Sequence, residues 1–118
     1  MGCALSSVPD GDYVVDTLSV IECESFKWQL NANTSKLNVS EGNWFNSRAS
    51  TLNHESLTLE GTPTSFQILG LRLPIQCEGQ IENRGGLYYL KGEATYGANT
   101  GTYTIGLEPS IAGINAAF

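Results

Sequence analysis

The feature that most constrains this chain is an alternation of residue types, broken by glycine, over the segment Gly86–Leu107. Successive side chains of an extended strand point to opposite faces, so the alternation places Tyr103, Ile105 and Leu107 together on one face. A similar run precedes them, and the two runs flank the glycine-bounded segment 97–101. This pattern predicts an antiparallel hairpin with a five-residue loop at 97–101.

Short alternating runs separated by glycine, asparagine or proline recur along most of the chain. Phe26, Trp28 and Leu30 share one face of such a run, as expected for a half-buried strand. The run 71–77 contains Pro74, which cannot donate to a ladder, and it therefore predicts an edge strand or a bulge. The sequence predicts an all-β fold, a single antiparallel β-barrel or β-sandwich of about eight to ten short strands.

The chain is expected to form one domain preceded by a leader. Residues 1–11 carry a turn signal and no periodicity, so they predict a flexible leader. Residues 12–118 have the usual size of one β-domain. In the first run, Tyr13–Cys23, the apolar residues change face partway, and a bulge near Asp16 would reconcile the two halves.

The composition argues against several classes of partner. The net charge is −6, and only six lysines and arginines are scattered along the chain, so nucleic-acid binding is not expected. No glycine-rich phosphate loop or dinucleotide fingerprint is present, and no cofactor is expected. Charged residues make up 15% of the chain, whereas serine, threonine and asparagine are abundant. This polarity without charge favours an extracellular or bacterial envelope location, with a cytoplasmic location as the alternative.

The N-terminal sequence Met-Gly-Cys-Ala-Leu-Ser-Ser has three interpretations. Gly2 and Ser6 fit a myristoylation pattern, in which Cys3 would carry a second, palmitoyl chain. Alternatively, Cys3 is the lipidated first residue of a mature bacterial lipoprotein. The third interpretation is a chance match, because so short a pattern is weakly specific. Membrane contact is expected only through such an anchor on Cys3.

Two further cysteines each end an extended run. Cys23 and Cys77 could lie on neighbouring strands, and a disulfide between them would close a loop of about 54 residues, stabilising by roughly 3–4 kcal/mol. Such a bond agrees with an oxidising compartment. The alternative is that both are reduced, buried and apolar in character.

No catalytic arrangement stands out. His54 is the only histidine and is interpreted as a surface loop residue. Glu22 and Glu24 flank Cys23 and share a strand face, where like charges could raise one pKa, but they are interpreted as a solvated strand end. No spacing typical of a metal site is present, so none is expected.

The aromatic residues offer the best candidate binding surface. Flat aromatic rings beside asparagine, serine and threonine suit a glycan or a small apolar ligand, although core packing explains such residues too. The predicted ligand-binding residues are Trp44, Tyr88, Tyr96 and Tyr103.

The leading hypothesis is a non-enzymatic binding module for a small apolar ligand or a glycan, exported or tethered to the envelope. The alternative is a structural subunit that assembles with copies of itself or other chains through edge strands and the apolar tail 110–118. A small β-barrel cyclase or isomerase is a third hypothesis, and it would need an enclosed cavity with one polar group.

Overall fold

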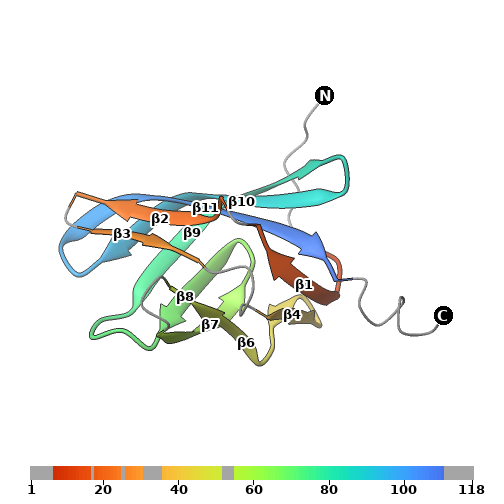
Figure 1. The fold of residues 1–118 in the computed structure, drawn as a ribbon, viewed down its shortest axis with the longest axis horizontal. Coiled ribbons are helices and arrows are strands. Elements are labelled where there is room, and N and C mark those ends of the chain that lie inside the picture. Colours follow the sequence, from red (N-terminus) through yellow and green to blue (C-terminus); the bar gives the residue numbers. More distant parts are fainter. Residues whose placement is uncertain (1–6, 17, 25, 31–35, 52–54, 111–118) are drawn as a thin grey trace.

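The computed structural model of the chain describes residues 7–16, 18–24, 26–30, 36–51 and 55–110, and all regular elements there are strands. Eleven strands form one antiparallel sheet that curls into a nearly closed barrel (Figure 1). The all-β prediction is confirmed, and the sheet takes the barrel form. The strand bounds are β1 Gly11–Val15, β2 Val20–Cys23, β3 Phe26–Gln29, β4 Leu37–Ser40, β5 Asn43–Trp44, β6 Ser47–Ser50, β7 Ser56–Thr62, β8 Ser65–Leu69, β9 Ile75–Arg84, β10 Leu87–Tyr96 and β11 Asn99–Pro109.

The sheet closes between β4 and β6. Its strand order is β5-β4-β1-β11-β10-β9-β8-β7-β6, with β2 paired to β11 and β3 paired to β2. The backbones of Lys36 and Arg48 exchange two hydrogen bonds of 2.8 Å across the gap. The Ser47 hydroxyl donates to the Asn38 carbonyl at 2.8 Å and accepts from the Asn38 amide at 2.9 Å. Closure provides hydrogen-bond partners for backbone amides and carbonyls that would be unpaired at the edges of an open sheet.

The strand is interrupted near Asp16, as the sequence predicts, but the predicted change of face is wrong: Tyr13, Val15 and Ile21 are all buried, whereas Leu18 is 76% exposed. Strands β1 and β2 both pair with β11: Val15 lies opposite Leu107, and Val20 lies opposite Thr104. From Val15 to Val20 the chain advances five positions, whereas β11 advances only three between their partners. The segment between β1 and β2 therefore contains two extra residues. The Asp16 amide donates to the carbonyl of Gly106 at 2.7 Å, so the bulge stays attached to β11.

The predicted hairpin at 86–107 is also confirmed, with a tighter turn than expected. Tyr96 pairs with Asn99, so β10 and β11 are joined by two residues instead of five. The first of these, Gly97, has a φ of +62°, as a type II′ turn requires. This φ value favours glycine, which explains why the turn falls there.

Two other sequence predictions are wrong in detail. The strand predicted over 71–77 begins only at Ile75; Pro74 has no amide hydrogen to donate, and Leu73 before it is exposed. Ordered packing also begins earlier than residue 12, because Val8 is 2% exposed within the core. The predictions for Cys3, His54 and the segment 111–118 lie outside the described residues.

Two glycines occupy core-facing positions on the neighbouring strands β9 and β10. Gly79 and Gly92 face each other in the register, on the side of the sheet that carries the core residues. A Cβ atom on Gly92 would lie 2.5 Å from the Cα of Gly79, closer than real contacts allow. The neighbouring backbones therefore approach closely only because glycine occupies both positions.

Within the part of the chain that the structure describes, no helix is long and apolar enough to span a membrane.

Replacing Gly92 by alanine should lower the free energy of unfolding by more than about 2 kcal/mol, because the new methyl group meets backbone atoms that cannot move aside. Urea unfolding followed by circular dichroism measures this. Gly85→Asn is the matched control, since its Cβ has nothing within 4 Å and asparagine tolerates the φ of +61°. Equal losses in the two variants would contradict the close approach at Gly92.

Candidate functional site

The candidate site is a groove of about 560 Å³ on the outside of the barrel, and we call it the β1–β4 groove. Strand β1 lines it with Asp12, Tyr13 and Val14. The start of β4 and the residue before it, the segment after β5, and the residue after β11 supply the other walls, which are Lys36, Leu37, Asn38, Phe45, Asn46 and Ser110. Apolar atoms make up most of this lining, and polar groups lie among them.

A short polar network crosses the groove between β1 and β4. Asp12 and Asn38 are direct partners in the register, and the Asn38 side-chain amide donates to the Asp12 carboxylate at 2.6 Å. The same amide nitrogen reaches the carbonyl of Gly11 at 3.4 Å. These bonds fix the orientation of an amide and a carboxylate, the groups that commonly bind ligand hydroxyls.

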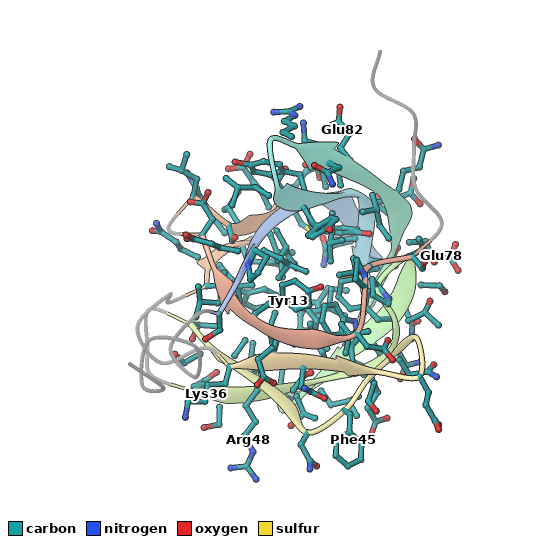
Figure 2. The ribbon with its side chains drawn as sticks, turned by 90° about the vertical axis from the view of Figure 1, so that its right-hand side faces the viewer. Tyr13, Lys36, Phe45, Arg48, Glu78 and Glu82 are labelled. Atoms are coloured by element: carbon teal, nitrogen blue, oxygen red, sulfur yellow. The ribbon has the colours of Figure 1, made fainter. Side chains whose placement is uncertain are left out.

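Phe45 is the exposed aromatic residue of the groove. Its side chain is 58% exposed, and Figure 2 shows it projecting outward from the barrel. Its backbone is held in place, because the Phe45 amide donates to the Asn38 carbonyl at 2.9 Å. Asn46 follows with a φ of +47°, and the buried Ser47 returns the chain to the sheet. An apolar ring is thus held at the groove on a fixed backbone.

Two of the predicted ligand-binding residues belong to the core. Trp44 is 6% exposed and Tyr103 is 2% exposed, and both rings pack edge-on against Phe66, at centroid distances of 5.9 and 5.6 Å. The Trp44 indole nitrogen and the Tyr103 hydroxyl have no hydrogen-bond partner among the described residues. Neither side chain is presented to solvent, so the core-packing interpretation applies to both.

The other two predicted residues lie at different ends of β10. Tyr88 is half-buried and contacts Tyr13 edge-on at 6.0 Å. Tyr96 packs edge-on against Phe26 and Trp28, at 5.1 and 5.3 Å. The four predicted residues are therefore not brought together, and only Tyr88, through Tyr13, adjoins the β1–β4 groove.

Of the groove residues that sequence reasoning missed, only Phe45 had a local signal, which was the alternation of faces. Adjacent residues of a strand face opposite sides, so Trp44 and Phe45 cannot both enter the core. With Trp44 facing inward, Phe45 has to face outward. The pairing of β1 with β4, which brings Asp12 to Asn38, has no comparable local signal, because the two strands are far apart in sequence.

The region around Glu22 and Glu24 is a more open surface than the β1–β4 groove. Both carboxylates line a shallow depression of about 650 Å³, with Thr100 and Thr102 of β11 opposite. Glu22 forms an exposed ion pair with Lys27 at 3.7 Å. Among the described residues, no three histidine, cysteine, aspartate or glutamate side chains gather to hold a metal ion.

Cys23 and Cys77 are free thiols, and the prediction that they lie on neighbouring strands is wrong. The register aligns Cys23 with Gly101, Gly101 with Ala94, and Ala94 with Cys77, so β11 and β10 separate the two cysteines. Both are buried, and burial raises the pKa of Cys77 to about 12, with a smaller contribution from Cys23. The alternative interpretation, two reduced and buried cysteines, describes this structure.

Tyr103→Phe should leave stability unchanged or raise the free energy of unfolding by about 1 kcal/mol, since it removes a buried hydroxyl that has no described partner. Tyr13→Phe is the control, because the Tyr13 hydroxyl donates to the carbonyl of Pro9. That variant should lose about 1 kcal/mol. Chemical unfolding of both proteins measures the difference, and a clear loss in Tyr103→Phe would mean that its hydroxyl is bonded.

Stability should fall as the pH rises above about 9. Burial raises the pKa of Cys77 from 9.0 to about 12 and also raises the pKa of Tyr103 above 10.0. The unfolded chain therefore loses these protons at lower pH than the folded chain does. Each group then lowers the free energy of unfolding by up to ~1.4 kcal/mol per pH unit between its unfolded and folded pKa values.

Urea unfolding at several pH values between about 8 and 11 measures this decline. Cys77→Ala should show a shallower decline than the unsubstituted chain, because one of the titrating groups is gone. Identical slopes for the two proteins would show that the Cys77 thiol does not contribute.

No family model matches the chain, and no curated protein or solved structure matches it either. The comparisons therefore assign no family to this barrel and no ligand to its groove.

Proposed function

We propose that this protein is a non-enzymatic binding module that holds a glycan in the β1–β4 groove. The observation that carries this proposal is the exposed ring of Phe45, 58% exposed and held at the groove by the hydrogen bond of its backbone to Asn38. An exposed aromatic residue on a fixed backbone loses little conformational entropy when a ligand covers it. It also gains from removing apolar area from water.

The chemistry of the groove favours a glycan over a purely apolar ligand. A sugar ring has an apolar face of C–H groups and a rim of hydroxyls, which match an aromatic ring beside Asp12, Asn38 and Asn46. A purely apolar ligand would instead favour an enclosed interior. Buried side chains, including Tyr13, occupy the interior of this barrel (Figure 2). An exported or envelope-tethered protein, as the sequence predicts, would meet glycans at the cell surface.

Phe45→Ala should weaken glycan binding at least about tenfold, or ~1.4 kcal/mol, because the apolar surface that covers the sugar face is lost. The measurement is binding of the full chain to an array of immobilised neutral and acidic oligosaccharides, followed by titration calorimetry with the best ligand. The folded state should be unaffected, since the Phe45 side chain is mostly exposed.

Leu73→Ala is the matched control, because Leu73 is another exposed apolar side chain, 46% exposed, on a different part of the surface. It should bind like the unsubstituted protein. The proposal fails if no oligosaccharide on the array binds in the millimolar range or tighter, or if Phe45→Ala binds normally.

A further inference from the structure

The barrel seam carries two adjacent cations, and no carboxylate of the described residues lies within 4.0 Å of either. Lys36 and Arg48 form an isolated antiparallel bridge and exchange both backbone hydrogen bonds, so their side chains leave the sheet on the same face. Both side chains are exposed. Figure 2 shows them along the same outer side of the barrel as Phe45. Two like charges directly opposite each other cost stability in a sheet.

This pair is unusual within so acidic a chain. The protein has six lysines and arginines against twelve aspartates and glutamates. Lys27, Arg84 and Lys91 are each within 4.0 Å of a glutamate carboxylate. In the described part of the chain, no such ion pair includes Lys36, Arg48 or Arg72, and of these three only Lys36 and Arg48 lie opposite each other in the sheet. The seam is therefore a local concentration of unneutralised positive charge on an acidic protein.

Lys36 also lines the β1–β4 groove, so this positive charge is continuous with the proposed binding site. Lys36 and Asn38 are two residues apart along an extended chain, which places them about 7 Å from each other on one face. The Asp12 carboxylate, which would repel an anion, is bonded to Asn38 at the other end of this stretch. The groove therefore has positive charge at one end, from Lys36 at the seam, and negative charge at the other, from the Asp12 carboxylate beside Asn38.

We infer that the ligand of the β1–β4 groove is an acidic glycan, whose carboxylate or sulfate group is bound by Lys36 and Arg48. This inference rests on the proposed function. A sugar ring next to the acidic group covers Phe45, and its hydroxyls meet the amides of Asn38 and Asn46. The anion removes the repulsion between the two cations, and charge-assisted hydrogen bonds from lysine and arginine are stronger than those between neutral groups.

The test presents each uronate-containing or sulfated oligosaccharide beside its carboxyl-reduced or desulfated form. The unsubstituted chain should bind at least one acidic form about tenfold more tightly than the neutral form, a difference of ~1.4 kcal/mol. The double variant Lys36→Gln/Arg48→Gln should lose this preference and bind the acidic and neutral forms with equal affinity. The preference should also shrink as salt is raised, because both cations are exposed.

The control is Lys27→Gln/Arg72→Gln, which changes the net charge by the same amount at positions outside the groove. It should retain the preference. Equal binding of acidic and neutral forms, or an unchanged preference in Lys36→Gln/Arg48→Gln, overturns the inference and leaves glycan binding intact. Absence of binding to every oligosaccharide overturns both proposals.

A further experiment compares vesicles of phosphatidylserine with vesicles of phosphatidylcholine. If the protein binds only the anionic vesicles, and Lys36→Gln/Arg48→Gln does not, the ligand is a lipid surface instead of a glycan.

Discussion

The pairing of β11 with its neighbours is the constraint on which the rest of the barrel depends. Along one edge it pairs with β10 from Asn99 to Leu107, and along the other it pairs with both β1 and β2. The two extra residues between β1 and β2 allow both strands to follow the same edge. Figure 1 shows the result, with β2 and β3 toward one end of the molecule and β1 and β4 toward the other.

The candidate site follows from this arrangement. Strand β1 is held on β11 and in turn pairs with β4, which brings Asp12 opposite Asn38. Strand β4 meets β6 at the seam, which brings Lys36 opposite Arg48. An aromatic ring, an amide, a carboxylate and two cations thus gather on one outer surface. Barrel closure is needed only to bring Arg48 beside Lys36, since β4 and β6 lie near opposite ends of the strand order.

Local patterns predicted the strands where side chains alternate and the turns where backbone geometry requires glycine. The hairpin of β10 and β11 was predictable because alternation and a positive φ at Gly97 depend only on neighbouring residues. The run 71–77 was mispredicted because its leucines alternate as a strand does, whereas Pro74 has no amide hydrogen for a ladder. Leu73 was left on the surface as a consequence. Trp44 and Tyr103 resembled a binding surface because sequence shows aromatic character but not burial.

By itself, the sequence determined the all-β class, the alternation of faces and the interruption near Asp16, since each follows from the chemistry of residues close together in the chain. Only the tertiary structure decided that Cys23 and Cys77 are separated by two strands, that Trp44 and not Phe45 faces the core, and that Lys36 and Arg48 are neighbours. These relations depend on which strands pair and where the barrel closes. Such pairing is decided by the fit of the whole core, and no short segment of the chain encodes it.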